Sequence, residues 1–172
     1  IFLALRQLWP DAVGKINCTL GDSVFVEVQN APDFSASVLK ERIRELVDRH
    51  IPLIRRRVPL DQALQRYRQQ GQQDKERLFR WRTADYFDEY AYGDFADYYY
   101  GEMLPTTGYL TVWDLFGADG GFVFVYPDSA APERCARVPA MPNFFSVFTE
   151  GERWCALMEC ENVADLNDMT QS

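Results

Sequence analysis

The chain has 172 residues, with 18 Lys and Arg against 26 Asp and Glu, a formal net charge of −8 and a pI of about 4.7. This length fits one domain with a buried core, and the 47% hydrophobic share excludes a disordered chain. The negative charge argues against nucleic acid as a partner, because phosphate binding needs a surplus of Lys and Arg. The single histidine excludes a metal or catalytic site built from several histidines of one copy.

The first half of the chain predicts helices around a hairpin and an edge strand. Apolar residues at helical spacing predict helices over 1–9, 36–50, from Pro59 to a C-cap at Gly71, and over 74–79. Runs of β-forming residues predict strands over 15–16, 24–28 and 53–58, and the turn residues Gly21-Asp22 join the first two.

The second half changes character at residue 81, where aromatic and β-branched residues become frequent. Turn signals divide this region into predicted strands over 86–92, 95–99, 108–116 and 122–126. A proline-rich loop over 127–142 follows, then a helix over 144–158 with a kink near Gly151, and a last helix over 163–168 with Asn162 as N-cap. This order predicts an α+β fold with an antiparallel β-sheet packed against helices.

We expect a single domain over 1–172, with a helical and hairpin part over 1–80, an aromatic sheet over 81–126 and a helical part over 143–170. The chain begins at Ile1 inside an apolar run that Pro10 ends, without the basic flank of a signal peptide and too short for a membrane span. We therefore expect a segment of a longer cytoplasmic protein. The four cysteines form no CxxC pair and are predicted to be reduced, mostly buried thiols: Cys18, Cys135, Cys155 and Cys160.

Several short features have a structural interpretation. The chain contains no GxxxxGK[ST] loop and no GxGxxG, HExxH or GxSxG motif. The glycine-rich run 117–121 lies between two strand patterns, which predicts a hairpin turn and not a phosphate loop. His50 is predicted to cap the C-terminus of the first long helix, and Arg55-Arg56-Arg57 to protect a solvated edge strand.

The segment from Asp94 to Tyr109 is the most distinctive stretch of the chain. Tyr98, Tyr99 and Tyr100 follow one another in a predicted strand, and Thr106-Thr107-Gly108 predicts a compact turn. Ordinary β-sheet packing explains such tyrosines, and so does a tyrosine-lined pocket mouth that stacks a planar ring. Composition alone favours sheet packing.

Residues 97–105, Asp-Tyr-Tyr-Tyr-Gly-Glu-Met-Leu-Pro, resemble the second signature of the threonyl-tRNA synthetase editing domain, Asp-x-Cys-x-Gly-Pro-His-x-Pro. Residues 5–10, Leu-Arg-Gln-Leu-Trp-Pro, resemble the end of the helix that carries that family's His-x-x-x-His motif. The order of elements agrees from Ile1 to about Tyr109, including Lys75. The resemblance implies an editing-domain-like α+β fold.

A closer resemblance is to bacterial nucleoside (uridine) kinase-like proteins, in which such a domain precedes a P-loop kinase domain. It is carried by residues 82–84, 97–101, 105–109 and 161–168. This resemblance implies a parent protein that phosphorylates a nucleoside with ATP beyond residue 172. ATP and Mg²⁺ are then expected only in that kinase domain, and no cofactor is expected in this segment.

The departures from the editing pattern bear on catalysis. Tyr99 stands at the position of the family's cysteine and Met103 at that of its histidine, whereas Asp97 and Lys75 match polar residues of the editing pocket. We therefore expect no catalytic and no metal-binding residue. A candidate cleft comprises Lys75, Asp97, Tyr98, Tyr99, Tyr100, Met103, Thr106 and Thr107.

The expected role is ligand binding, regulation or domain positioning. The expected partners are neighbouring domains of the same chain, with a small-molecule ligand as a further candidate, and neither nucleic acid nor a membrane. Two alternatives stay open: a divergent aminoacyl-tRNA deacylase that acts in trans, and a protein-interaction domain with exposed aromatic side chains.

Overall fold

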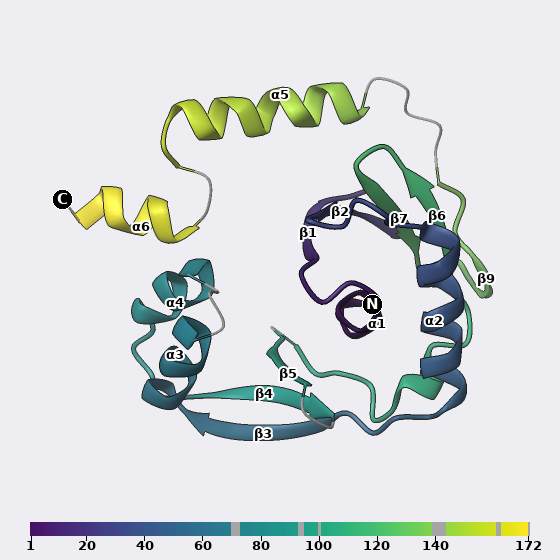
Figure 1. Ribbon diagram of the computed structural model, residues 1–172, viewed down its shortest axis with the longest axis horizontal. Coiled ribbons are helices and arrows are strands. Elements are labelled where there is room, and N and C mark those ends of the chain that lie inside the picture. The colour runs from purple at the N-terminus through teal and green to yellow at the C-terminus, as the bar shows by residue number, and fades with distance from the viewer. Residues whose placement is uncertain (70–72, 93–94, 100, 139–143, 161–162, 172) are drawn as a thin grey trace. The chain divides into compact units, whose positions relative to one another are not determined.

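The computed structural model describes residues 1–69, 73–92, 95–99, 101–138, 144–160 and 163–171. The chain forms two compact units (Figure 1). Unit 1 comprises Ile1–Ile54, Ala91–Ala96 and Tyr100–Pro139, and unit 2 comprises Arg55–Tyr90, Asp97–Tyr99 and Ala140–Ser172. The boundaries of these units differ from those of the three sequence-predicted parts, and the single domain over 1–172 stays a prediction.

Unit 1 is built on a four-stranded sheet of strand order β1-β2-β7-β6, in which all neighbours are antiparallel. Its strands are β1 (Val13–Thr19), β2 (Ser23–Gln29), β6 (Asp114–Ala118) and β7 (Gly121–Val125). The β1–β2 and β6–β7 connections contain Gly21 and Gly120, with φ of +59° and +73°, a region that glycine adopts without steric cost. Both predicted hairpins, including the one at the glycine-rich run, are confirmed.

One hydrophobic core of unit 1 lies on the face of this sheet to which strand alternation directs Val24 and Val26, while Phe25 and Val123 of the opposite face are buried too. Val24 and Val26 of β2 lie opposite Phe124 and Phe122 of β7, and all four are buried. The helices α1 (Phe2–Leu8) and α2 (Ala36–Asp48) pack against this layer (Figure 1). Their buried contributions are Ala4, Leu5, Leu39, Ile43 and Leu46.

The predicted strand over 108–116 is wrong in its first half. Thr107–Tyr109 forms a 3₁₀ turn, η1, and β6 begins only at Asp114. Just before Gly108, Leu53 N–H donates to Pro105 O at 2.9 Å and Thr107 N–H to Ile51 O at 2.9 Å. Within the segment that follows, Leu110 N–H donates to Thr107 O at 3.1 Å and Thr111 N–H to Tyr109 O at 2.9 Å. These bonds satisfy the backbone away from the sheet and keep the strand short.

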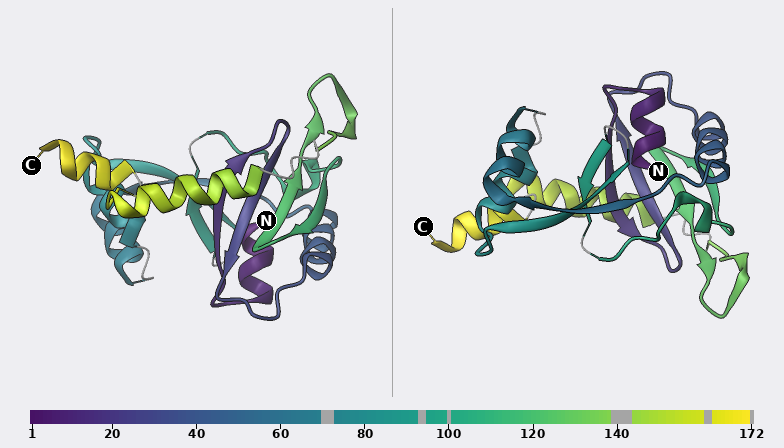
Figure 2. Two further views of the ribbon diagram at one scale, coloured as in Figure 1. Left: turned by 90° about the horizontal axis from the view of Figure 1, so that it is seen from above. Right: turned by 90° about the horizontal axis from the view of Figure 1, so that it is seen from below.

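The predicted loop over 127–142 contains a hairpin, so that prediction is wrong up to Cys135. Strands β8 (Pro127–Asp128) and β9 (Ala131–Cys135) pair antiparallel and extend from the rest of unit 1 (Figure 2). Asp22 Oδ2 accepts hydrogen bonds from Ser129, 3.1 Å from its backbone N–H and 3.0 Å from its hydroxyl. A side chain distant in sequence thus fixes a turn that local proline content suggested to be irregular.

The C-terminus of α2 is closed by backbone geometry. His50 follows the C-cap residue Arg49, has φ of +48° and donates its backbone N–H to Val47 O at 3.0 Å. Its imidazole lies against Gly108, where a Cβ atom would be 2.0 Å from His50 Nδ1. His50 lies at the end of α2 as predicted, but the C-cap residue is Arg49, and the left-handed backbone of His50 ends the helix.

Unit 2 contains most of a three-stranded sheet of order β3-β4-β5. Its strands are β3 (Ile54–Pro59), β4 (Tyr86–Tyr92) and β5 (Phe95–Tyr98). Residues 54, 91–92 and 95–96 of these strands belong to unit 1. β3 is an edge strand, and Arg55 and Arg57 on its same face contact Asp88 of β4 at 2.6 and 3.2 Å. The predicted charged edge strand is confirmed.

The helices of unit 2 are α3 (Leu60–Gln69), α4 (Gln73–Arg80), α5 (Phe144–Leu157) and α6 (Val163–Gln171). α6 contacts α4, where Arg77 pairs with Asp165 at 2.7 Å and with Asp168 at 2.6 Å. α5 runs through Gly151 without the predicted interruption, because a solvent-facing glycine weakens a helix without having to break it. The predicted caps Gly71 and Asn162 lie outside the described residues.

Among the described residues, no helix combines the length and the apolar character needed to cross a bilayer. All four cysteines are described and all are thiols. They are half-buried, so the expectation that most would be buried is wrong.

Candidate functional site

An ion pair between α4 and β5 joins two of the sequence-predicted site residues. Lys75 Nζ donates to Asp97 Oδ1 at 2.5 Å. Asp97 is only 8% exposed, and its Oδ1 also accepts the backbone N–H of Tyr98 at 2.8 Å. A carboxylate that burial removes from water needs such partners, because an uncompensated buried charge is unstable. The pair is therefore a fixed part of unit 2.

Aromatic rings surround one side of this pair. Tyr67 of α3, Phe79 of α4 and Phe87 of β4 stack, with ring centroids 5.6 Å (Tyr67–Phe79) and 5.1 Å (Phe79–Phe87) apart. Tyr98 meets Phe79 edge-on at 4.9 Å. The Lys75 ammonium lies 5.5 Å from the Tyr67 ring centroid, within the range of a cation–π interaction. We call Tyr67, Phe79, Phe87 and Tyr98 the aromatic cluster.

A second ion pair lies beside the aromatic cluster. Glu89 of β4 is 2% exposed, and its carboxylate accepts two hydrogen bonds from the Arg66 guanidinium of α3, one of them from Nη1 at 3.2 Å. Burial lowers the pKa of Arg66, but the hydrogen bond and the charge of Glu89 outweigh it and raise that pKa overall. The guanidinium is also 5.6 Å from the Tyr67 ring. Both cations of this region therefore face one tyrosine.

The Tyr67 hydroxyl stays protonated in this environment. Burial raises its pKa to about 12, and the negative charge of Asp97 acts in the same direction, while Arg66 partly opposes both. The hydroxyl oxygen lies near Arg66 without a hydrogen bond of good geometry to any described group. At neutral pH the phenol can therefore donate a hydrogen bond but cannot serve as a base or nucleophile.

Tyr99, another residue of the predicted cleft, packs its ring edge-on against Tyr90 at a centroid distance of 6.1 Å. Tyr100 lies outside the described residues. Unit 2 thus contains the Lys75–Asp97 pair beside the aromatic cluster, to which Tyr98 belongs, and Tyr99 packs against another ring. Both interpretations of the tyrosine run, sheet packing and a ligand site, agree with this arrangement.

The remaining predicted cleft residues belong to unit 1. Met103 is 37% exposed, and Thr106 forms an isolated bridge to Pro52. Thr107 Oγ1 accepts the N–H of Ile51 at 2.9 Å and donates to Leu46 O at 2.6 Å. The Thr107 hydroxyl thus has a structural task at the end of α2. That these residues share one ligand site with Lys75 and Asp97 stays a prediction.

Sequence reasoning missed Arg66, Tyr67 and Glu89 as neighbours of the Lys75–Asp97 pair. One signal was present in β4, where Phe87, Glu89 and Ala91 occupy alternate positions and are all buried. A charged residue on the inward face of an otherwise apolar strand requires a partner of opposite charge. The identity of that partner could not be read from the strand, because Arg66 lies on another element.

Within the described part of the chain, no group of three or more His, Cys, Asp or Glu side chains could hold a metal ion. The candidate site consists of two ion pairs, a buried phenol and stacked rings. Tyr67, Phe79 and Phe87 are buried, so their rings serve packing, and a ligand-binding role of this set stays a prediction.

The chain is similar to part of the threonine–tRNA ligases of Burkholderia mallei (strain SAVP1), Burkholderia pseudomallei (strain K96243) and Methylobacillus flagellatus. Each is 28% identical over 123 residues, which is 69% of this chain. The chain spans 19% of the length of these curated relatives. No family model matches the chain. The similarity supports a related editing-like domain and agrees with the α+β fold described above.

Proposed function

We propose that this chain is a non-catalytic, editing-like domain of a nucleoside (uridine) kinase-like protein of the cytoplasm. Its role is to bind a ligand, to regulate the parent protein or to position neighbouring domains. The parent phosphorylates a nucleoside with ATP and Mg²⁺ at a P-loop outside this segment. No cofactor belongs to the segment itself.

The non-catalytic role rests on which residues occupy the positions shared with the editing pattern and on what they contact. Lys75 and Asp97 match that pattern and form an ion pair with each other. Tyr99 replaces the cysteine and packs against Tyr90, and Met103 replaces the histidine. A thioether has no proton to exchange at neutral pH, and a tyrosine cannot replace a thiolate. The polar framework of the pocket is retained without its reactive groups.

The kinase-like parent rests on the sequence resemblance at residues 82–84, 97–101, 105–109 and 161–168. The small share of the ligases that the chain matches is compatible with an editing-like module that occurs in more than one kind of parent protein. Fold similarity alone would not carry function from one parent to the other.

Two assays on the full-length parent test this proposal. With ATP, Mg²⁺ and uridine we expect nucleoside-dependent formation of ADP, and with a mischarged threonyl- or alanyl-type tRNA we expect hydrolysis at the rate of buffer. Absence of nucleoside-dependent ADP formation would contradict the kinase parent. Hydrolysis above the buffer rate that is lost on Asp97→Ala would establish the deacylase alternative.

A variant pair tests the ligand-binding role. Asp97→Ala combined with Tyr99→Phe removes the buried carboxylate and one phenol of the candidate cleft. We expect it to change the response of kinase activity to nucleosides and nucleotides. Tyr109→Phe, in unit 1 and largely exposed, is the matched control and should leave the response unchanged. Identical responses in the double variant and the control would eliminate the cleft as a ligand site.

A further inference from the structure

Unit 1 contains an open cavity of about 470 Å³, a size typical of small-molecule sites. It shares no residue with the candidate site of unit 2. Polar side chains from α1 and from the end of α2 line it together with two rings, namely Arg6, Gln7, Arg49, Tyr92 and Phe95. Leu3 and Ile51 add apolar surface.

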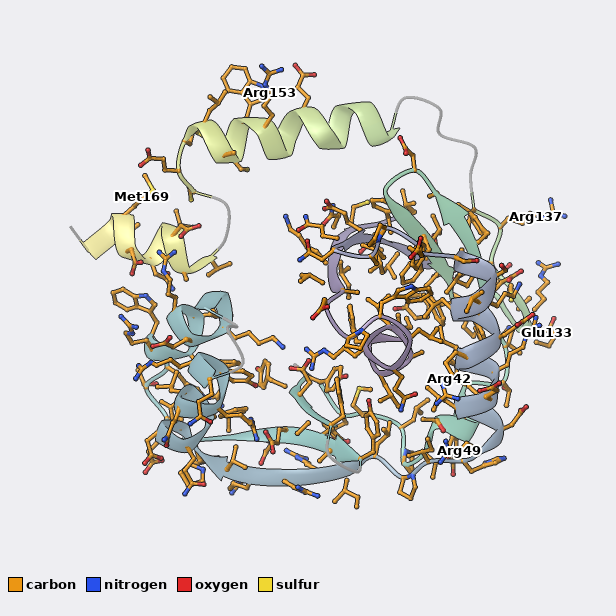
Figure 3. All side chains as sticks on the ribbon, viewed as in Figure 1. Arg42, Arg49, Glu133, Arg137, Arg153 and Met169 are labelled. Atoms are coloured by element: carbon orange, nitrogen blue, oxygen red, sulfur yellow. The ribbon has the colours of Figure 1, made fainter. Side chains whose placement is uncertain are left out.

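Within the described part of the chain, two cations of this cavity have no ion pair. Among the described residues, neither Arg6 nor Arg49 forms an ion pair, although acidic residues outnumber basic ones by 26 to 18 in this chain. Several arginines elsewhere are paired with carboxylates, namely Arg42, Arg55, Arg57, Arg66, Arg68, Arg77 and Arg80, whereas Arg6 and Arg49 both line one cavity. Arg49 directly follows α2 (Figure 3). Two unpaired guanidinium groups at one concave surface favour an anion.

The Arg6 side chain is held in position by an aromatic ring. Its guanidinium carbon lies 4.8 Å from the Phe95 ring centroid, and Tyr92 stacks on Phe95 at 5.0 Å. A guanidinium on a ring face keeps its N–H edges available for a planar, two-oxygen acceptor. Tyr92 and Phe95 line the cavity, so a planar ligand can contact their aromatic surface beside Arg6.

Gln7 supplies a neutral donor to the same cavity. Its Oε1 atom accepts hydrogen bonds from Arg42 Nε at 3.1 Å and Nη2 at 2.9 Å. Because its oxygen faces Arg42, the amide is oriented and its NH₂ group remains the donating end. The cavity therefore combines two cations, one amide donor and an aromatic wall.

We propose that this cavity binds a small organic anion with a carboxylate or phosphate head on a planar ring. Arg6 and Arg49 bind the head group, and Tyr92 and Phe95 contact the ring. The proposal does not depend on the function proposed for the candidate site in unit 2, because none of its residues takes part.

Calorimetric titration of the full-length protein with phenyl phosphate, benzoate, inorganic phosphate and benzyl alcohol tests the proposal. We expect saturable binding of phenyl phosphate or benzoate, at least tenfold tighter than inorganic phosphate and benzyl alcohol. The tighter of the two ring-bearing anions identifies the head group. Arg6→Gln and Arg49→Gln should each weaken this binding at least tenfold.

Arg137→Gln is the matched control, since Arg137 is an exposed arginine of the same unit (Figure 3). Arg49 is exposed as well, so its replacement should leave folding intact even if Arg6→Gln perturbs α1. Thermal melting of each variant checks this. Binding that is unchanged in Arg49→Gln would overturn the proposal. So would an affinity for inorganic phosphate or benzyl alcohol equal to that for the tighter ring-bearing anion, or binding of neither ring-bearing anion.

Discussion

Lys75 and Asp97, 22 positions apart in the sequence, form an ion pair whose two ends differ in exposure. The Asp97 side chain is 12% exposed and that of Lys75 34% exposed, with Nζ and Oδ1 2.5 Å apart. Removing the Lys75 cation leaves the buried Asp97 anion without its partner, whereas removing the Asp97 anion leaves a lysine that can reach water. The two ends of the pair are therefore energetically unequal.

This asymmetry gives the first prediction. Lys75→Met should lower the free energy of unfolding by about 1–2 kcal/mol, because Asp97 then retains only the Tyr98 N–H as a partner. Asp97→Asn should cost less, since its amide oxygen can still accept that N–H. Urea denaturation of both variants and of the double variant measures the effects. A double variant less stable than Lys75→Met alone would contradict this account.

The buried phenol of Tyr67 predicts a pH dependence at the alkaline end. Its folded-state pKa is about 12, above the ordinary value of 10, so the folded state holds its proton more tightly than the unfolded state. The resulting stabilisation is complete below pH 10 and is lost as the pH rises from about 10 to 12. Stability should therefore fall across this window.

Tyr67→Phe is the variant that isolates this contribution. It removes the titrating group and keeps the stacked ring, so the decline in unfolding free energy between pH 10 and 12 should be shallower than in the unchanged protein. Tyr109→Phe removes a largely exposed phenol and should leave the decline as it was. Equal slopes for Tyr67→Phe and Tyr109→Phe would show that Tyr67 titrates as in the unfolded chain.

Close packing of β7 on β2 predicts a strong effect at Gly121. A Cβ atom there would lie 2.0 Å from Val26 O and 3.0 Å from Glu27 Cα, and neither backbone atom can move without disturbing the sheet. Gly121→Ala should therefore destabilise the protein by about 2 kcal/mol or more. At Gly101 a Cβ would meet nothing within 4 Å, so Gly101→Ala should change stability by less than about 0.5 kcal/mol. Thermal denaturation of the two variants gives the comparison.

The ion pairs of Arg77 on α4 predict which contacts hold α6 on α4. Its guanidinium contacts Asp165 and Asp168, and Trp81 Nε1 donates to Asp168 at 3.1 Å. Arg77→Met should accelerate amide hydrogen exchange in α6, because its two carboxylates lose their common cation. Arg68→Met breaks a contact with Glu76 of α4 and serves as the control, because Arg68 forms no ion pair with α6 among the described residues. Equal exchange in both variants would mean that other contacts hold α6.

Much of the fold could be predicted because its signals are local. The alternation in β2, the turn at Gly21 and the apolar stripe of α2 each lie within a few residues of one another, and all three predictions are confirmed. The strand predicted from Gly108 failed because Leu110 and Thr111 donate their N–H groups to nearby carbonyls instead of a sheet neighbour, in a turn whose first residue, Thr107, bonds to Ile51. That competition between partners is invisible in a short stretch of sequence.

The candidate site also combines residues that the sequence could predict with contacts that only the fold creates. A motif resemblance selected Lys75 and Asp97, and the structure places their side chains in contact. The same resemblance grouped Met103, Thr106 and Thr107 with them, yet these three fold as part of unit 1, where Thr107 bonds to the end of α2. The partner of Glu89 and the cation of the unit 1 cavity beside Phe95 came from the structure alone.

The sequence by itself determined the acidic balance, the single histidine and the α+β pattern. These follow from residue identity and short-range periodicity, which need no knowledge of the folded chain. Only the tertiary structure decided which charges are paired, which tyrosine is buried and which arginines face a cavity. Such facts depend on distance and exposure, and both arise when segments far apart in the sequence pack together.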